Sequence, residues 1–521
     1  MNSFTSKAGW WCKRSVRMVS SSSSSSLSST ESSRQIPAAW LRQVLEDRAE
    51  APRLYAWRLA NLPDGNGKPS YARNSPENET VIENNPDDES RRIYILGVGN
   101  IGRLYAIFLA KSDGTRQRPP ITLVVHRREL LEQWKAHPGV ELVRGSDDND
   151  GGRRVVERNP AFRVEWWTDA QPAHGPAREP GPGMGGVVRN LIVATKAPDA
   201  MPQVDRVRRY LGGASTVAFA QNGMCKLWPP LGEAYVAARW PGGDSTTSNS
   251  PEWLACVTTH GVTSLGPFRS VHASPADVLV GPVLVPGVRR DSGVKGSTTS
   301  SRSNASEEDK DRNTSSTSNY LVEQIVRAPG LNGRKVATRA LWVAQLEKLV
   351  VNSVINPLTA VLRCKNGELF EERGDGLKDV IEMLVDEASR TLRALVAHPS
   401  SDGILLAQDE NEQDSETKGT VAAEESLEKT REELLERFSP ARLRTMLHGV
   451  GEKVAANTSS MLQDVRAGKK TEIEDFNGWL VETARYLGDE GGLPVNEKLI
   501  SLVVDSAART RDELVKELRG S

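Results

Sequence analysis

A glycine pattern between a short apolar run and a helical stretch is the feature that most restricts the fold of this chain. The pattern consists of Gly97, Val98, Gly99, Asn100, Ile101 and Gly102. It follows the run IYIL and opens the stretch NIGRLYAIFLAKS. The first glycine permits a tight turn, the second lets a ligand approach the backbone, and the third lets helix and strand pack closely. The pattern therefore predicts a strand, a tight turn and a helix in that order.

Two kinds of hydrophobic pattern follow each other along the chain. From about residue 91 to 285, short β-branched runs recur, among them ITLVVH, NLIVATKA, STVAFAQNG, ACVTTHGV and DVLVGP. Strands that alternate with helices indicate a parallel, doubly wound sheet. From about residue 335 onward, apolar residues recur at helical spacing, as in ALWVAQLEKLVVNSVIN. The sequence thus predicts an α/β domain followed by an all-α domain.

Composition excludes several classes of partner. The 67 Lys and Arg residues nearly cancel the 68 Asp and Glu residues, so charge gives no case for a nucleic-acid or membrane-surface partner. The four cysteines form no C-x-x-C pair, which fits neither a disulfide framework nor a zinc site. No stretch approaches the roughly 18 apolar residues of a membrane span. We expect a soluble protein without a metal, as a monomer or a homodimer.

Several polar segments lie outside the periodic ones. Residues 1–36 are basic and serine-rich, which is typical of a mitochondrial targeting segment, the alternative being a disordered tail on a cytoplasmic protein. Five further stretches cannot bury enough apolar area and are interpreted as surface loops; they are residues 62–90, 145–186, 241–251, 286–319 and 399–431. The expected domains are 1–36 (targeting or disordered), 37–90 (extension and linker), 91–330 (sheet domain) and 331–521 (helical domain).

The glycine pattern also predicts a dinucleotide site, because a helix N-terminus offers amide hydrogens and partial positive charge to a pyrophosphate. The alternative is a glycine-rich turn without a ligand. After the next strand an NAD site usually places an acid, but here ITLVVHRREL supplies Arg127, then Arg128. A guanidinium suits a 2′-phosphate, which favours NADPH. Glu129 could serve NAD instead, and both arginines could be ordinary surface residues.

A polar stripe runs along an otherwise apolar helix in the second half of the chain. Lys348, Asn352 and Asn356 recur every four residues, so they lie along one slowly winding line. Buried amides and an ammonium group are unfavourable without partners. The stripe should therefore face either other polar groups or a polar ligand. The alternative is that the lysine reaches solvent and the asparagines bond neighbouring backbone.

Two long motifs resemble the signature segments of the ketopantoate reductases. These are KLVVNSVINPLTAVLRCKNGEL and NTSSMLQDVRAGKKTEIEDFNGWL, and LGVGNIG, VATKA, QNGM and THG match shorter pieces in the same order. The resemblance covers roughly residues 92 to 510. It implies a Rossmann-type domain joined to a helical domain like that of 6-phosphogluconate dehydrogenase. It also implies NADPH-dependent reduction of 2-dehydropantoate to (R)-pantoate, for coenzyme A synthesis.

The resemblance also implies residue roles. Lys348 would be the general acid, and Glu472 would help to fix its amine beside the nicotinamide ribose. The substrate would be held by Asn352, Asn356, Asn366, Asn457 and Ser460. The cofactor would be contacted by Lys196, Asn222 and the backbone of Val262, besides the glycine turn. Cys225 departs from the small residue usual in the family and puts the exact placement of the nicotinamide in doubt.

Two rival functions stay open. One is a related reductase of a different branched 2-oxo acid. The other is a mitochondrial scaffold or regulator that keeps the fold without catalysis. A lapsed site has no reason to keep Lys348, Asn352, Asn366, Ser460 and Glu472 together, which argues against the second.

Overall fold

The computed structural model describes residues 38–63, 86–111, 117–145, 155–182, 186–241, 249–283, 320–407 and 420–520. The expected targeting segment and the expected loop at 286–319 lie outside these ranges. Residues 37–521 belong to one compact unit by their internal contacts.

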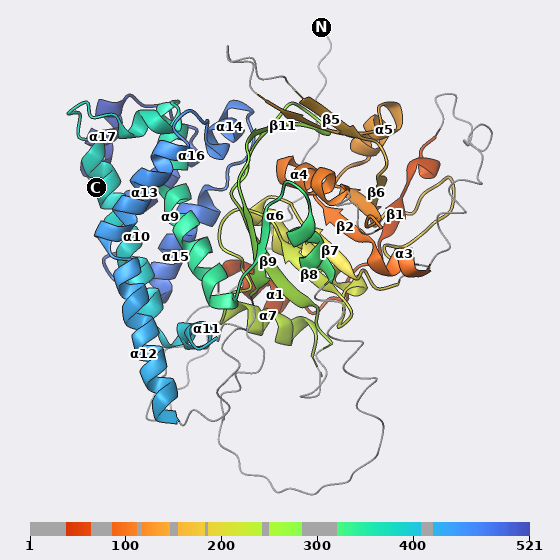
Figure 1. Cartoon of the computed structure of the whole chain (residues 1–521), viewed down its shortest axis with the longest axis horizontal. Coiled ribbons are helices and arrows are strands. Elements are labelled where there is room, and N and C mark those ends of the chain that lie inside the picture. The colour runs from red at the N-terminus through yellow and green to blue at the C-terminus, as the bar shows by residue number, and fades with distance from the viewer. Residues whose placement is uncertain are drawn as a thin grey trace, which may run out of the picture. The chain divides into compact units, whose positions relative to one another are not determined.

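A nine-stranded sheet forms the first half of the described chain (Figure 1). Its strand order is β1-β6-β3-β2-β7-β8-β9-β12-β13. The strands are β1 (Tyr55–Trp57), β6 (Arg163–Thr168), β3 (Ile121–Val125), β2 (Ile93–Leu96), β7 (Asn190–Val193), β8 (Thr216–Phe219), β9 (Glu252–Thr258), β12 (Val278–Pro282) and β13 (Gly333–Lys335). From β6 to β9 the six central strands are parallel. All residues of β2, β3, β7 and β8 are buried, which explains their unbroken apolar runs.

The order of the central strands reverses between β2 and β7, which is the doubly wound arrangement that the sequence predicted. Ligands of such folds bind beyond the carboxyl ends of the strands at this switch point. The connecting helices of the sheet domain are α4 (Asn100–Leu109), α5 (Arg128–Ala136), α6 (Ala197–Val207) and α7 (Leu231–Arg239), and α3 (Pro86–Arg91) precedes β2.

A second, four-stranded sheet has the order β10-β11-β4-β5. Its strands are β10 (Gly261–Ser264), β11 (Arg269–Ser274), β4 (Val140–Arg144) and β5 (Val155–Asn159). Strands β11 and β4 are parallel although they are more than 120 residues apart in the chain. Helix α4 contacts β4, β10 and β11, so this sheet covers the helix that follows the glycine turn.

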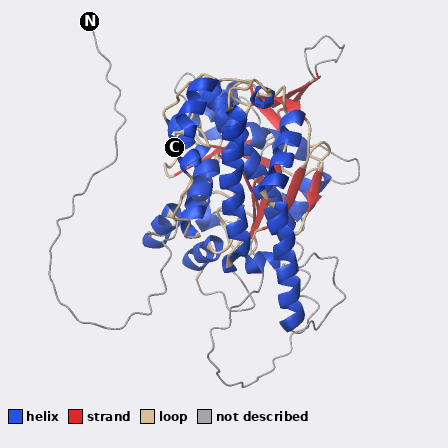
Figure 2. Ribbon diagram, turned by 90° about the vertical axis from the view of Figure 1, so that its left-hand side faces the viewer, coloured by secondary structure: helices blue, strands red, loops and turns tan. Residues whose placement is uncertain are grey.

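The helical domain packs against the far end of the large sheet, through α9 on β9 and β12. Figure 2, which faces this half, shows its blue helices in front of the red strands. Its helices are α9 (Thr338–Leu362), α10 (Leu377–Ala397), α11 (Asp402–Leu405), α12 (Thr420–Arg437), α13 (Pro440–Lys453), α14 (Ser460–Arg466), α15 (Trp479–Tyr486), α16 (Pro494–Val504) and α17 (Arg511–Arg519). A π-helix, η5 (Glu474–Gly478), leads into α15. The 25-residue α9 and the 21-residue α10 are the long elements around which the others pack.

Helix α9 contains a proline and stays continuous because a side chain replaces the missing hydrogen bond. Pro357 has no N–H to give to the carbonyl of Ser353. Asn477 Nδ2 donates to that carbonyl at 2.9 Å and also to Asn496 Oδ1 at 2.8 Å. The π-helix that carries Asn477 is thereby fixed against the middle of α9.

Some segments expected as loops or linkers carry structure. Strand β6 lies within the stretch 145–186, and most of α12 lies within the stretch 399–431. The expectation that these are surface loops throughout is wrong, because β6 pairs with β3 and buries Trp167. In the expected extension, β1 pairs with β6, and α1 (Ala39–Glu46) packs on α7. These pairings are long-range, so local composition does not reveal them.

Candidate active site

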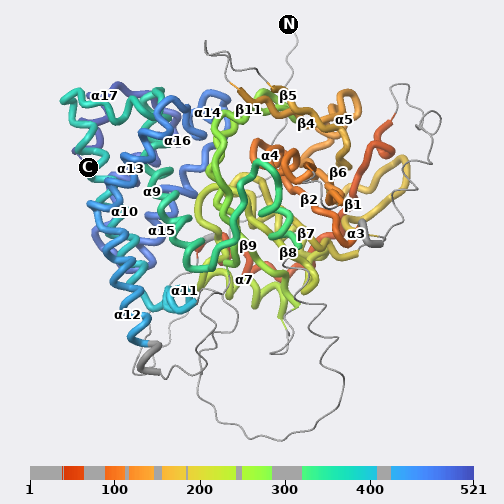
Figure 3. The backbone as a smooth tube through the Cα atoms, viewed as in Figure 1, coloured from red at the N-terminus to blue at the C-terminus, as the bar shows by residue number. Residues whose placement is uncertain are grey.

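Four segments of the predicted site, and one residue that was not predicted, Thr258, lie at the carboxyl ends of neighbouring parallel strands. The glycine turn follows β2, Arg127 follows β3, Lys196 follows β7, Asn222 follows β8, and Thr258 ends β9. The tube in Figure 3 shows that α9 of the helical domain comes to the sheet beside β9. The predicted site therefore runs along the carboxyl ends of the parallel strands, from the glycine turn at the switch point to β9, where α9 packs.

The glycine turn has the shape of a phosphate cradle. Gly97 has a φ of 99°, and a Cβ there would lie 2.8 Å from the backbone of Ala194. A Cβ on Gly102 would lie 2.0 Å from the carbonyl oxygen of Gly97. Gly99, the N-cap of α4, differs because a Cβ there would meet no atom of the described chain within 4 Å. Close packing thus requires Gly97 and Gly102, whereas the space beside Gly99 is open for a ligand that approaches the backbone.

The amine of Lys348 joins α9 to the sheet domain. Lys348 Nζ donates to Asn222 Oδ1 at 2.9 Å and to the carbonyl of Thr258 at 2.6 Å. Burial lowers the pKa of Lys348 to about 8, and the nearby Glu472 carboxylate opposes this shift. The side chain is half-buried in the structure. The amine therefore neither points into bulk solvent nor lies sealed inside the helical domain.

Glu472 is a buried carboxylate that faces two lysines. Its Oε1 accepts the backbone N–H of Ala197 at 3.1 Å, in the first turn of α6. Its Oε2 lies 3.8 Å from Lys196 Nζ, which also forms an ion pair with Asp464. Burial opposes a charged Lys196, but the carboxylates of Glu472 and Asp464 raise its pKa overall. Lys196, proposed to contact the cofactor, is thus held charged between two acids of the helical domain.

The amides proposed for the substrate come from α9 and the segments next to it. Asn356 and Asn366 are buried, and Asn352 and Asn457 are half-buried. Asn356 Nδ2 donates to Ser460 Oγ at 3.5 Å, so α9 meets the start of α14.

A second group of contacts joins Asn366 to Asn457. The backbone N–H of Asn366 donates to the carbonyl of Asn457 at 3.1 Å, and Asn457 Nδ2 donates to Ser274 Oγ at 3.2 Å. Asn366 Oδ1 is buried without a hydrogen-bond partner among the described residues. Such an oxygen is unfavourable unless a ligand or water donates to it.

The other residues predicted at the cofactor site differ in their exposure and in their bonding partners. Arg127 is exposed at the N-cap of α5 and has no charged partner in the described part of the chain. Arg128 is engaged, because it pairs with Glu132 at 2.8 Å. The carbonyl of Val262 accepts from Asn100 Nδ2 at 3.2 Å, which ties β10 to the glycine turn. Cys225 is buried, and burial raises the pKa of its thiol to about 12.

Sequence reasoning missed three groups that the structure brings to the site. Thr258 contributes a backbone carbonyl, which no side-chain pattern signals. Asp464 lies inside the second signature segment and could have been found as the acid nearest Ser460. The guanidinium of Arg103 donates to the carbonyl of Val98 at 2.9 Å and to Ser270 Oγ at 3.0 Å, and so supports the glycine turn from beneath.

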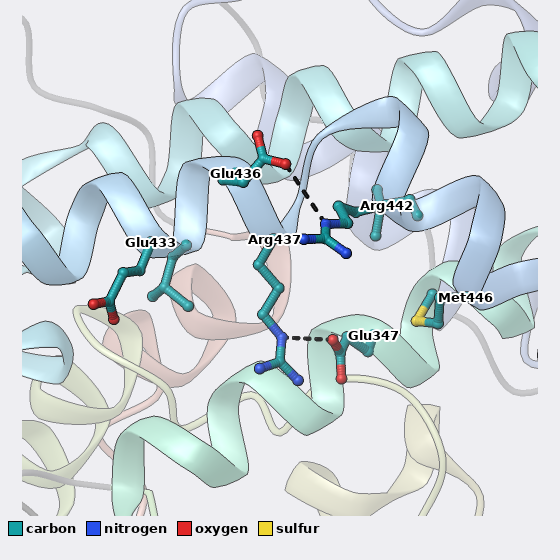
Figure 4. Close-up of a pocket in the computed structure, with 8 residues that line it drawn as sticks. Glu347, Glu433, Glu436, Arg437, Arg442 and Met446 are labelled. Carbon is teal, nitrogen blue, oxygen red and sulfur yellow. Dashed lines mark hydrogen bonds and ion pairs between the residues drawn. The ribbon is translucent and has the colours of Figure 1, made fainter.

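Several other features lie apart from this cluster. A hollow of about 430 Å³ beside α12 and α13 is lined by Glu347 and Arg437, which pair at 2.7 Å (Figure 4). In the described ranges, no three or more His, Cys, Asp and Glu side chains are arranged to hold a metal ion. Nor is any helix of those ranges long and apolar enough to cross a membrane.

Comparison with known proteins identifies the family. Two family models match the chain, "Ketopantoate reductase PanE/ApbA" over residues 93–284 and "Ketopantoate reductase PanE/ApbA C terminal" over residues 340–505. A ketoisovalerate reductase of Gibberella fujikuroi is 40% identical over 471 residues, which cover 89% of this chain and 95% of the relative. The chain belongs to the ketopantoate reductase family. It is therefore an oxidoreductase of a family that works with a nicotinamide cofactor.

The chain is also similar to a further relative and to a solved structure. A ketoisovalerate reductase of Beauveria bassiana is 36% identical over 489 residues, which cover 92% of this chain and 98% of the relative. A crystal structure of a probable 2-dehydropantoate 2-reductase from Bacillus subtilis covers 80% of this chain and 99% of its own, with 18% identity and a TM-score of 0.44.

Proposed function

We propose that the chain reduces a branched 2-oxo acid of the ketoisovalerate type to the 2-hydroxy acid, with NADPH as the reductant. The observation that carries the proposal is the amine of Lys348, which lies between Asn222 and the carbonyl of Thr258 at the carboxyl ends of β8 and β9. The two ketoisovalerate reductases that match nearly the whole chain support this substrate class. In the reaction, NADPH, a proton and the 2-oxo acid give NADP⁺ and the 2-hydroxy acid.

Lys348 supplies the proton. Negative charge develops on the ketone oxygen during reduction, and an ammonium group within hydrogen-bond reach lowers that barrier by releasing its proton to this oxygen. A pKa of about 8 suits this role, because the amine is mostly protonated at neutral pH and yet gives up its proton readily. Glu472 favours the protonated form and holds the segment before the π-helix against α6.

Neutral amides orient the acid. Asn352, Asn356 and Asn457 can bond to a carboxylate without adding charges that would shift the pKa of Lys348. Asn366 and Ser460 complete the set on the side of α14. Of these residues, Asn457 also contacts Ser274 of the sheet domain, so a substrate bound there would lie next to that domain.

The cofactor site fits a dinucleotide phosphate. When bound, NADPH supplies the hydride. The open backbone at Gly99 and the N-terminus of α4 can take the pyrophosphate, and the exposed Arg127 can pair with a 2′-phosphate. Thr195 Oγ1 and Gln221 Oε1 are buried without hydrogen-bond partners among the described residues, in the loops after β7 and β8. Both oxygen atoms are therefore available to bond the nicotinamide end of the cofactor.

Ketopantoate is the second candidate substrate, because one atom of the site favours it. Ketopantoate carries a hydroxyl group that ketoisovalerate lacks. The buried Asn366 Oδ1 has no described partner and could accept from that hydroxyl. A site built to bond a hydroxyl discriminates strongly against the analogue without it. The name of the family models supports this candidate as well.

A substrate panel separates the candidates. Purified protein is assayed for loss of NADPH absorbance with ketoisovalerate, ketopantoate, pyruvate and phenylglyoxylate, each repeated with NADH. We expect the highest kcat/KM for ketoisovalerate with NADPH. A preference of about tenfold or more for ketopantoate would move the assignment to pantoate formation. No turnover on any 2-oxo acid despite NADPH binding would reject both and favour a scaffold role.

A further inference from the structure

An ion pair that the proposed reaction does not use joins the loop after β8 to the π-helix. Lys226 Nζ lies 3.2 Å from Asp475 Oδ1, with side-chain exposures of 24% and 8%. The second oxygen, Oδ2, is buried without a hydrogen-bond partner among the described residues. A buried carboxylate is strongly unfavourable once its cation is removed. Asp475 therefore depends on Lys226, and the pair fixes the separation of the segments that carry them.

These are the two segments that surround the amine of Lys348. Lys226 is four residues after Asn222, which accepts from Lys348, and Asp475 is three residues after Glu472, whose charge acts on the same amine. The two backbones also touch, because a Cβ on Gly223 would lie 3.0 Å from the carbonyl oxygen of Asp475. One segment belongs to the sheet domain and the other to the helical domain.

We propose that Lys226 and Asp475 are a positioning pair for hydride transfer, which holds the Asn222 loop against the Glu472 segment and so keeps the Lys348 amine enclosed between the two domains. The kinetic part of this inference rests on the proposed function. Neither residue needs to touch the substrate. The π-helix fits the role, because such insertions in α-helices often occur at functional sites and here direct Asp475 toward the loop.

The amine of Lys348 offers a direct reporter of this geometry. Burial is the largest influence on its pKa, followed by the charge of Glu472. Burial of the amine depends on the two domains meeting over it. If the junction loosens, water reaches the amine and its pKa rises toward the ordinary value of 10.5.

The kinetic test compares Lys226→Met and Asp475→Asn with wild type. Each change should lower kcat on the order of tenfold, because small displacements of reacting groups have large effects. The Kd for NADPH should change less than about threefold, and the primary isotope effect with deuterated NADPH should rise as hydride transfer becomes rate-limiting. Lys226→Arg should restore most of the activity, because it keeps the cation.

The matched control is Arg437→Met. It breaks the Arg437–Glu347 pair, which also connects to α9 but faces the hollow beside α12 and α13 (Figure 4). This change should leave kcat and the isotope effect as in wild type. Thermal melts of all variants verify folding, and Asp475→Asn keeps the shape of the side chain if Lys226→Met proves unstable.

A second readout needs no turnover. The pH dependence of Lys348 acetylation by acetic anhydride, followed by mass spectrometry, gives the pKa of the amine in wild type and variants. We expect a higher pKa in Lys226→Met and an unchanged value in Arg437→Met. An unchanged Lys348 pKa in folded Lys226→Met overturns the proposal, whether or not kcat falls. If wild type reduces no 2-oxo acid, the proposed function fails while the labelling still decides this one.

Discussion

Lys348 Nζ donates to Asn222 Oδ1 at 2.9 Å, and this bond joins α9 of the helical domain to the loop after β8 of the sheet domain. The amine of this lysine donates to two protein oxygens, the side-chain oxygen of Asn222 and the carbonyl of Thr258, in place of water. In the proposed reaction, the carbonyl oxygen of the substrate would replace one of these two acceptors and receive the proton from the amine.

Loss of the amine should remove turnover and spare cofactor binding. We expect Lys348→Met to lower kcat by about 10²- to 10⁴-fold, the usual effect of a general acid, with the Kd for NADPH within about threefold of wild type. Fluorescence titration measures the binding. The control is Glu347→Gln, which changes the residue directly before Lys348 and weakens the ion pair of that residue with Arg437. This variant should stay active. Substantial turnover by Lys348→Met would reject the assigned role.

The rate of reduction should depend on pH through the amine. Because the pKa of Lys348 is lowered to about 8, the amine is protonated below pH 8 and neutral above it. The kcat/KM for reduction should therefore be level below pH 8 and fall about tenfold per pH unit above it, whereas oxidation of the 2-hydroxy acid should rise over the same range. Initial rates from pH 6 to 10 test this. A profile that breaks near pH 10.5 would mean that the amine is not desolvated.

Two glycines of the turn should respond differently to alanine. A Cβ on Gly102 clashes with the carbonyl of Gly97, so Gly102→Ala should reduce the free energy of unfolding by about 1–3 kcal/mol. A Cβ on Gly99 meets no described atom, so Gly99→Ala should keep the stability and raise the Kd for NADPH about tenfold or more. Denaturant unfolding and fluorescence titration separate the effects. Equal stability losses in both variants would argue against an open phosphate site at Gly99.

Cofactor preference should depend on Arg127. We expect Arg127→Gln to raise the KM for NADPH by about tenfold and to leave the KM for NADH unchanged, because a charge-assisted hydrogen bond to the 2′-phosphate is lost. Arg128→Gln is the matched control, since Arg128 already pairs with Glu132. If Arg128→Gln has the larger effect, the second arginine carries the preference. If neither changes it, the phosphate is read elsewhere.

The sequence predicted those strands and helices that depend on patterns among neighbouring residues. Buried parallel strands leave unbroken apolar runs, and the glycine turn has its own signature, so β2, β3, β7 and β8 and the helix after Gly99 were all predicted. Of the polar stripe on α9, Lys348 and Asn356 contact polar groups, namely Asn222 and Ser460, whereas the role of Asn352 stays a prediction. Their catalytic roles remain predictions.

The rest depends on pairings between distant segments. No local pattern in residues 140–144 reveals that they pair with 269–274, and the second sheet therefore escaped prediction. The helical spacing of residues 427–438 predicted the second part of α12, but the polar composition of residues 420–426 resembles a loop, although α12 is one helix that contacts α10 and α13. The contact of Lys196 with Asp464 spans 268 residues and becomes visible once the two domains are assembled.

Strand β13 lies immediately before α9 in the chain and connects the start of that helix to the large sheet. It pairs with β12 from Val278 to Val280, and the next backbone bond runs from Val336 to the carbonyl of Val280, two residues before α9 begins. Val283 follows β12, and five residues separate β13 from a helix over residues 320–327. The start of the helix that carries Lys348 is therefore stapled to the large sheet by backbone hydrogen bonds, so side-chain substitutions in β13 should leave its position unchanged, whereas Val336→Pro would remove the last of these bonds.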